Sequence, residues 1–150
     1  MVEDAVVNSA ETEALPPPLA GVRVLDFTAV VSGPFCTVLL ADMGAEIVKV
    51  EPPLGENTRH AVRYPGRAEQ DEDYFYVNNR SKKSIALDLK NPKAQELIHK
   101  MTVKADIIVE NFAPGTAGRL GISWDDLFPL NERLVYCSVS GFGQDGPYRD

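Results

Sequence analysis

A single stretch of about thirty residues near the start of the chain constrains the fold most strongly. Its first part, "GVRVLDF", is rich in apolar and β-branched residues and predicts a buried strand at about Val22 to Phe27. "VVSGPFCTVLLADMG" then predicts an apolar helix that Ser32 caps, that has Pro34 in its first turn and that ends at Gly44. "EIVKVE" from Glu46 predicts a second strand. A strand, a helix and a strand in this order form a βαβ unit, in which the two strands are parallel.

Strands and helices continue to alternate along the rest of the chain. Asn91 and Pro92 open a predicted helix, and Ser123 begins a shorter one with the pattern of a capping box. The first of these helices carries one apolar stripe, formed by Ala94, Leu97, Ile98 and Met101. Three more strands are predicted, at Ser84–Leu89, Asp106–Asn111 and Leu134–Val139. This alternation predicts an α/β fold with a mainly parallel sheet and helices on both faces.

The charge balance of the chain argues against several classes of protein. Its 150 residues carry 15 Lys and Arg against 22 Asp and Glu, a net charge of −7. A general nucleic-acid binder or a basic membrane-surface protein would show the opposite balance, and no apolar run approaches the roughly 20 residues that span a bilayer. Residues 1–19 carry only acidic charges, unlike a secretory or mitochondrial leader. We expect a disordered acidic tail over 1–19, one domain over 20–150, and a cytoplasmic protein that binds neither nucleic acid nor membranes.

Cysteine and histidine do not form a metal-binding pattern in this sequence. Cys36 and Cys137 both lie in apolar surroundings, which is typical of small buried side chains rather than of a disulfide or a metal ligand. His60 and His99 do not cluster with them. The sequence therefore predicts no metal site.

Basic residues gather locally in spite of the acidic balance. Arg80, Lys82 and Lys83 fall within four residues in "NNRSKKSIALDLK". More cations follow predicted strands or lie in loops, namely Arg59, Arg63, Lys90 and Arg119. A solvated edge would explain an isolated cluster of three, and a mobile surface loop would explain Arg59 and Arg63. Taken together, the cations favour a local polyanionic ligand, such as a nucleotide with several phosphates.

The loops after the strands are the expected ligand positions, because open parallel sheets bind ligands beyond the carboxyl ends of their strands. The first loop lacks the GxGxxG fingerprint, since only Gly33 is present, although Glu51 occupies the place of a ribose-binding acid. Amides near Ser32 can bind a phosphate or simply belong to a helix cap. In "ENFAPG", Phe112 can stack on adenine and Asn111 can bind a base or ribose, or the two can be a buried Phe and a turn-forming Asn.

The motifs taken in order resemble the class III CoA-transferases, the formyl-CoA and carnitine CoA-transferase type. The resemblance rests on "PLAGVRVLDFTAVVSGPFCTVLLADMGAEIVKVEPP", "TRH", "YFYVNNRSKKSIALDLK", "ADIIVENFAPGTAGRLG" and "LVYCSVSGFGQDGPY", and covers about Pro18 to Tyr148. It implies a Rossmann-like CoA-binding domain that is incomplete at its carboxyl end, and an interlocked homodimer or a complementing chain. CoA and acyl-CoA would be substrates, and no tightly bound cofactor is expected.

The resemblance also implies particular CoA contacts. They are Val31, Ser32, Leu87, Asp88, Leu89, Lys90, Asn111, Phe112, Ala113 and Arg119. In this interpretation the basic cluster faces the phosphates of CoA or borders that site. Two departures from the family pattern matter. Formyl-CoA transferases have a glutamine where this chain has Val31, which argues against formate or oxalate as substrate, and many members have an arginine where it has Pro52, so one contact on the adenine side of CoA is expected to be lost or replaced.

The chemistry that the resemblance implies is covalent transfer of CoA from an acyl-CoA to a carboxylic acid through an aspartyl anhydride and an aspartyl-CoA thioester. We expect no catalytic residue within residues 1–150, because Asp145 and Asp150 lack the family's tyrosine–aspartate context. The nucleophile is expected beyond Asp150. Two alternatives remain open: an α-methylacyl-CoA racemase of the same fold, and a CoA-binding fragment without catalysis.

Overall fold

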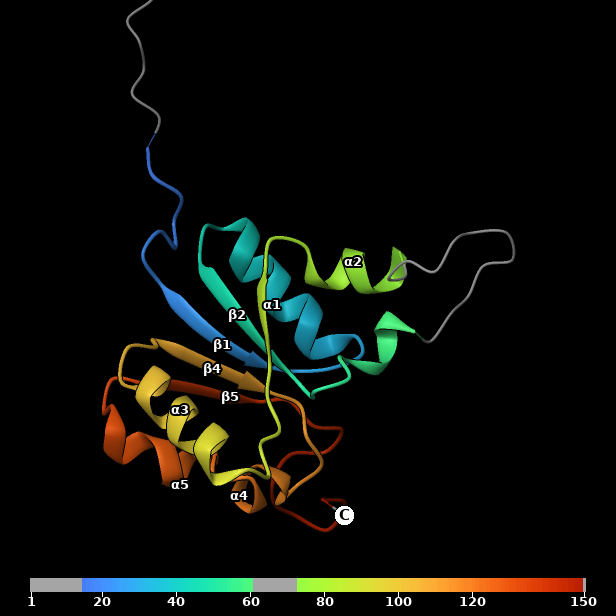
Figure 1. The fold of residues 1–150 in the computed structure, drawn as a ribbon, viewed down its shortest axis with the longest axis vertical. Coiled ribbons are helices and arrows are strands. Elements are labelled where there is room, and N and C mark those ends of the chain that lie inside the picture. Colours follow the sequence, from blue (N-terminus) through green and yellow to red (C-terminus); the bar gives the residue numbers. More distant parts are fainter. Residues whose placement is uncertain (1–14, 61–72, 150) are drawn as a thin grey trace, which may run out of the picture.

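The computed structural model describes residues 15–60 and 73–149, and these form one five-stranded parallel sheet with helices on both faces (Figure 1). The strand order is β3-β2-β1-β4-β5, and every neighbouring pair is parallel. The strands are β1 (Arg23–Phe27), β2 (Glu46–Glu51), β3 (Lys83–Ala86), β4 (Ile107–Glu110) and β5 (Val135–Ser138). The predicted α/β class and the parallel βαβ unit are confirmed.

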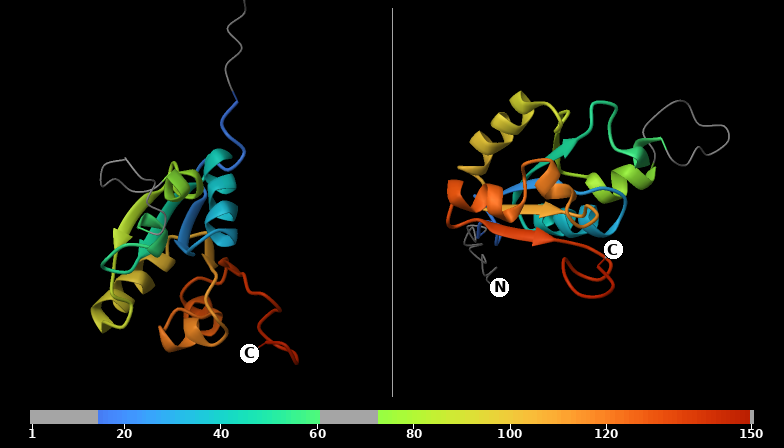
Figure 2. Two further views of the ribbon diagram at one scale, coloured as in Figure 1. Left: turned by 90° about the vertical axis from the view of Figure 1, so that its right-hand side faces the viewer. Right: turned by 90° about the horizontal axis from the view of Figure 1, so that it is seen from below.

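The helices divide between the two faces of the sheet (Figures 1 and 2). On one face lie α1 (Ser32–Asp42) and α2 (Asp73–Asn79), which pack against each other. On the other lie α3 (Pro92–Thr102), α4 (Thr116–Arg119) and α5 (Trp124–Leu127). Two short 3₁₀ turns complete the described elements, η1 (Asn57–Arg59) and η2 (Phe128–Leu130).

Alternation along the strands produces two separate apolar cores, because successive side chains of a strand point to opposite faces. The larger core lies under α3 and α5 and includes Leu25, Ile98 and Ile108. The smaller core lies on the α1 face and includes Val24 and Val109. The strands are thus buried on both sides, as parallel strands require.

Local sequence signals explain most of the element boundaries. The side chain of Asn91 accepts a hydrogen bond from the Lys93 N–H at 3.0 Å and starts α3, with Pro92 in the first turn. The Ser123 hydroxyl and N–H both donate to the Asp126 carboxylate, at 2.6 and 2.9 Å, so the predicted capping box of α5 is confirmed.

Other boundaries differ from the predictions. The cap of α1 is Val31 and not Ser32, which is the first helical residue and makes no capping hydrogen bond. The strand predicted to reach Leu89 ends at Ala86, although the Leu87 N–H still donates to the Glu51 carbonyl at 2.8 Å, and the chain turns toward α3 only at Leu89 and Lys90. In the apolar stripe of α3, Ala94 and Ile98 are buried but Leu97 is 38% exposed. The stripe is therefore narrower than its periodicity predicted.

Some expectations concern residues outside the described ranges. Arg63 and most of the acidic tail, residues 1–14, belong to this group. Within the described part of the tail, the Leu19 N–H donates to the Met43 carbonyl at 2.9 Å and Leu19 packs against the smaller core. Across residues 15–60 and 73–149, the helices are all too short or too polar to cross a membrane.

Candidate functional site

The carboxyl ends of the five strands form one edge of the sheet, where the register aligns Phe27 of β1 with Glu110 of β4 and Ser138 of β5. On the other side of β1, Glu51 of β2 aligns with Ala86 of β3. All ten predicted CoA contacts lie in or just beyond the segments that follow β1, β3 and β4. The fold therefore brings these three segments, far apart in sequence, to one edge.

The centre of this edge lies between β1 and β4, where the strand order reverses direction along the chain. Such switch points are the usual ligand positions in doubly wound sheets. Here the Asn111 side chain joins the two loops: its Oδ1 accepts from the Ala29 N–H and its Nδ2 donates to the Ala29 carbonyl, both at 2.8 Å. The Asn111 amide therefore ties the loop after β1 to the segment after β4.

The first loop presents Val31 and Ser32 at the start of α1, and both are exposed. Just before them, Val30 has φ of 72°, a left-handed conformation that costs a β-branched residue about 1–3 kcal/mol. Gly33 is required for space, since an added Cβ would lie 2.4 Å from Thr28 Cβ. The loop is thus tightly constrained by its surroundings.

The segment after β3 alternates between the core and solvent. Leu87 and Leu89 are partly buried and pack against the larger core, while Asp88 and Lys90 are exposed. The Asp88 carboxylate accepts the Lys90 N–H at 3.0 Å, and the Gln95 side chain donates to the Leu89 carbonyl at 2.9 Å. The turn is held by these bonds, and the Lys90 ammonium has no carboxylate partner among the described residues.

The segment after β4 carries the other predicted contacts. Phe112 is partly buried and packs against the larger core, and its N–H donates to Glu110 Oε2 at 2.7 Å. Ala113 is exposed. Arg119, at the end of α4, is also exposed and donates to Thr116 Oγ1 at 2.7 Å. Lys90 and Arg119 therefore lie near one edge of the sheet as solvent-facing cations.

Each cation of the basic cluster forms an ion pair with an acidic side chain of the same domain. Arg80 bonds to Asp42, and Lys83 contacts Glu46 at 2.5 Å; both pairs are exposed. The Lys82 side chain is only 1% exposed and its Nζ lies 2.9 Å from Asp26 Oδ2. Each of these three cations therefore neutralises an acid of its own domain, and these pairs do not support the interpretation of the three as a patch facing phosphates.

Glu51 likewise serves the fold. Burial alone would raise its pKa, but hydrogen bonds from Arg59, from Ser84 and from the Glu56 N–H outweigh burial and lower the pKa to about 2. The Arg59 Nε and Nη2 atoms each lie 2.7 Å from the Glu51 carboxylate, and the guanidinium lies 3.8 Å from the centre of the Phe75 ring. Glu51 is therefore a structural anion, and not an acid open to a ribose.

Sequence reasoning missed a buried polar network on the α1 face. Asp26, Lys49 and Glu56 are each 3% exposed or less. The Lys49 ammonium lies 2.6 Å from Glu56 Oε2, an oxygen that otherwise has no hydrogen-bond donor among the described residues. A signal was present, since Asp26 and Lys49 interrupt otherwise apolar strands. A charge in a strand buried on both faces needs a partner.

Cys36 and Cys137 are free and half-buried, and burial raises the pKa of the Cys36 thiol. Among residues 15–60 and 73–149 no group of His, Cys, Asp and Glu is arranged to hold a metal ion. Asp145 lies in the exposed segment after β5. Phe142 and Tyr148 in the same segment are more than 70% exposed and touch each other.

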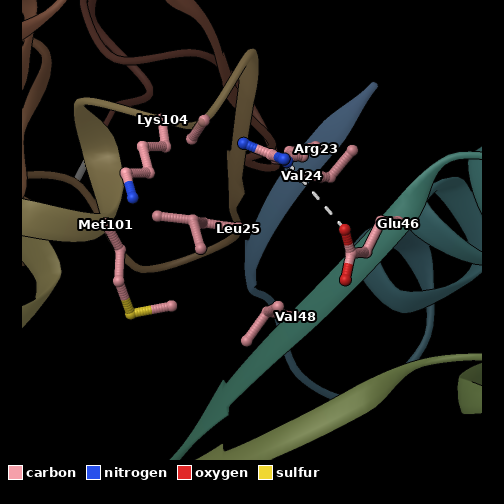
Figure 3. A pocket seen from close by; sticks show the side chains of 8 residues that line it. Arg23, Val24, Leu25, Glu46, Val48, Met101 and Lys104 are labelled. Atoms are coloured by element: carbon pink, nitrogen blue, oxygen red, sulfur yellow. Dashed lines mark ion pairs between the residues drawn. The ribbon is translucent and has the colours of Figure 1, made fainter. Parts of the chain in front are cut away.

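A pocket of about 370 Å³ lies elsewhere, between α3 and the amino-terminal parts of β1 and β2 (Figure 3). It is lined by Arg23, Val24, Leu25, Glu46, Val48, Met101, Lys104 and Ala105. Arg23 and Glu46 form an ion pair of 3.9 Å at its border. None of the predicted CoA contacts lines this pocket, so it is separate from the candidate site at the carboxyl edge.

Comparison with known proteins identifies the family of the chain. Residues 19–150 match the family described as CoA-transferase family III. The chain belongs to this family. The predicted resemblance is therefore confirmed, over nearly the same residues that carried it.

Several curated relatives are similar to this member of CoA-transferase family III. Succinyl-CoA–D-citramalate CoA-transferase of Chloroflexus aurantiacus is 47% identical over 90% of this chain and 33% of the relative. Formyl-CoA:oxalate CoA-transferase of Afipia carboxidovorans is 47% identical over 88% of this chain and 31% of the relative. Succinate–glutarate CoA-transferase of Agrobacterium fabrum is 40% identical, over 89% and 35%. The chain thus spans about a third of the length of these relatives.

Solved structures of similar proteins have the same fold. Rv3272 from M. tuberculosis has a TM-score of 0.82 and 42% identity, over 88% of this chain and 37% of that one. A CAIB/BAIF family protein from Brucella suis has a TM-score of 0.82 and 34% identity, over 90% and 36%. The Rossmann-like arrangement of this chain is therefore shared with proteins of known structure.

Proposed function

We propose that this protein is a CoA-transferase that moves CoA from an acyl-CoA to a small carboxylic acid. The observation that supports this most is the match of residues 19–150 to CoA-transferase family III, together with relatives named as CoA-transferases at 40–47% identity. The acids in the names of these relatives are dicarboxylates. A dicarboxylate is therefore the acceptor class that we propose, with Val31 as a position that bears on the choice.

The proposed CoA site is the carboxyl edge around the switch point between β1 and β4. It comprises Val31, Ser32, Leu87, Asp88, Leu89, Lys90, Asn111, Phe112, Ala113 and Arg119. Support comes from their shared edge and from the charge of Lys90 and Arg119, which are exposed and lack a carboxylate partner among the described residues. Such cations suit the phosphates of CoA.

The proposed chemistry begins with an aspartate carboxylate that attacks the thioester carbonyl of the acyl-CoA. The carbon–sulfur bond breaks, CoA leaves as a thiolate, and an aspartyl–acyl anhydride forms. The thiolate then attacks the aspartyl carbonyl, releasing the acyl group as a carboxylate and leaving an aspartyl-CoA thioester. The acceptor carboxylate takes CoA by the same two steps in reverse. Because a carboxylate is a weak nucleophile, its positioning and the stabilisation of the oxyanion are essential.

We propose that this aspartate lies beyond Asp150 and that the protein works in the cytoplasm as an interlocked homodimer. The test is incubation of the full-length protein with acyl-CoA and hydroxylamine. We expect an aspartyl hydroxamate, detected by mass spectrometry, at a position downstream of residue 150. A racemase would exchange the α-proton of the acyl group without any trapped ester, and a chain that only binds CoA would do neither.

The CoA site has its own test. Lys90→Ala and Arg119→Ala should each weaken CoA binding in isothermal titration calorimetry, with a loss that shrinks as salt is raised, because exposed charge–phosphate contacts are screened. Lys93→Ala is the matched control, since Lys93 is exposed on the first turn of α3. Unchanged affinity in both test variants would remove these two residues from the site.

A further inference from the structure

A buried ion pair is hydrogen-bonded to the backbone of the loop from Thr28 to Val30. Lys49 Nζ donates to the Thr28 carbonyl at 2.7 Å, and Glu56 Oε1 accepts the Val30 N–H at 2.8 Å. The two side chains also contact each other, with Lys49 Nζ 2.6 Å from Glu56 Oε2. The pair therefore binds the loop backbone at Thr28 and at Val30, the residues on either side of Ala29.

Two further side chains hold the same short loop. Asp26 Oδ1 accepts the Thr28 N–H at 2.8 Å. Asn111 binds both the N–H and the carbonyl of Ala29 at 2.8 Å. Five consecutive backbone groups, from the Thr28 N–H to the Val30 N–H, are therefore bound by side chains from β1, β2 and the segments that follow β2 and β4.

These contacts surround a residue whose backbone conformation is strained. Val30 has φ of 72°, which a β-branched residue keeps only where its surroundings impose it. Val31 and Ser32 follow directly, and both are exposed at the carboxyl edge of the sheet. The conformation of Val30 thus decides where these two residues lie.

We propose that Lys49 and Glu56 form a positioning pair for the ligand site: they impose the strained turn at Val30 and so place Val31 and Ser32, without touching the ligand. This inference rests on the proposed CoA site. Both side chains are buried, at 1% and 3% exposure. General stability is a poor explanation for the pair, because apolar replacement of a buried ion pair is often neutral or stabilising.

The experiment compares two double variants that are both uncharged at this place. Lys49→Met/Glu56→Leu removes every polar contact of the pair with the loop. Lys49→Met/Glu56→Gln restores one acceptor, placed for the Val30 N–H. Neither variant leaves a buried charge unpaired. The control is Ile98→Val, which lies in the larger core under the other face of the sheet.

CoA affinity is measured by isothermal titration calorimetry on the purified full-length protein below the unfolding transition of each variant. We expect the Leu variant to bind CoA roughly ten- to a hundredfold more weakly than the unmodified protein, the size expected when one or two hydrogen bonds to the ligand are lost. The Gln variant should recover a clear part of that loss, and Ile98→Val should bind CoA normally.

Steady-state kinetics and amide exchange add readouts that a merely structural role would leave unchanged. The KM for acyl-CoA should rise in the Leu variant while the KM for the acceptor acid stays the same. Hydrogen exchange at residues 28–30 should accelerate in the Leu variant more than in the Gln variant. This comparison needs only folded protein, and Lys49→Leu/Glu56→Met, which also leaves no buried charge unpaired, can replace the Leu variant if that variant does not fold.

The outcomes separate the two proposals. If the unmodified protein binds CoA and the Leu variant binds it within about twofold, the positioning role is wrong and the CoA site stands. Equal affinities of the Leu and Gln variants would also overturn the role, since at the loop they differ in the acceptor for the Val30 N–H. The same Gln oxygen also restores the acceptor for the Thr58 hydroxyl, which lies outside the loop. Failure of the unmodified protein to bind CoA would instead overturn the proposed site, and this inference with it.

Discussion

The two faces of the sheet bury their side chains by different means. Under α3 and α5 the core is mainly apolar, with Leu25, Ile98 and Ile108 among its members, although Thr102 and Glu110 are also buried there. On the α1 face, the same strands bury Asp26 and Lys49 near their carboxyl ends, next to a smaller apolar cluster. One face therefore buries mainly apolar area, whereas the other also buries paired charges and hydrogen-bonded polar groups.

This difference follows the position of the candidate site. Lys82 Nζ reaches Asp26 of β1, the Pro34 carbonyl of α1 and Asn79 of α2, at 2.9, 3.0 and 2.9 Å. The Lys82 ammonium therefore links the sheet to α1 and α2, close to the loop that follows β1. Polar contacts fix direction and apolar contacts do not, so the face that must hold a loop in one conformation uses charges.

The largest expected effect comes from breaking one buried pair. Lys82→Met leaves the Asp26 carboxylate, which is 0% exposed, without its cation. We expect a loss of about 3–5 kcal/mol in the free energy of unfolding, as for other buried pairs with one partner removed. Urea denaturation measures it. Lys83→Met is the matched control, because the neighbouring Lys83–Glu46 pair is exposed and should contribute less than about 1 kcal/mol. Equal losses in the two variants would contradict the comparison.

The apolar face should respond to a change of volume and not of charge. Ile98→Ala, at a side chain that is 0% exposed, should lower the free energy of unfolding by about 2–5 kcal/mol through lost burial and a residual cavity. The loss should be the same at low and high salt. Denaturation at two salt concentrations checks this, and a salt-dependent loss would show that the two faces are coupled.

Lowering the pH should reduce the stability contributed by the buried charges on the α1 face before it affects the other face of the sheet. The pKa of Glu51 is lowered from its ordinary value of 4.5 to about 2, so its contribution is complete above pH 4.5 and is lost as the pH falls toward 2. We expect about 1–3 kcal/mol of the pH-dependent stability in this window to be missing in Glu51→Gln. Glu96→Gln is the control, because the Glu96–Lys100 pair is exposed. Parallel stability curves for Glu51→Gln and the unmodified protein would rule this contribution out.

The smallest expected effect concerns a helix end that lies on the apolar face. Ser123→Ala removes the hydroxyl side of the capping box of α5 and should cost about 0.5–2 kcal/mol. CoA affinity should not change, because α5 is not among the elements that carry the candidate site. Denaturation together with calorimetry tests both parts, and a change in affinity would extend the site to α5.

The periodicity of apolar residues, together with helix caps and with glycine or proline at the ends of elements, was sufficient to predict the fold class. The five strands, α1, α3 and the capping box at Ser123 follow from apolar runs, from caps and from glycine or proline at the ends. These signals are local, since a helix start such as Asn91-Pro92 is decided by hydrogen bonds within a few residues. The ordered motifs also predicted the family, and parallel strands then placed the expected CoA contacts at one edge.

The partners of the charged side chains were decided only by the tertiary structure. In sequence, Arg80, Lys82 and Lys83 are three equivalent cations, yet in the fold Lys82 is buried against Asp26, 56 residues away, while the other two pair at the surface. The same holds for Lys49 with Glu56, and for Asn111, whose amide binds the backbone of Ala29, 82 residues away. A charge in a sequence shows that a partner is needed when it is buried. Which partner it finds depends on which distant segments the sheet brings together, and no local pattern carries that information.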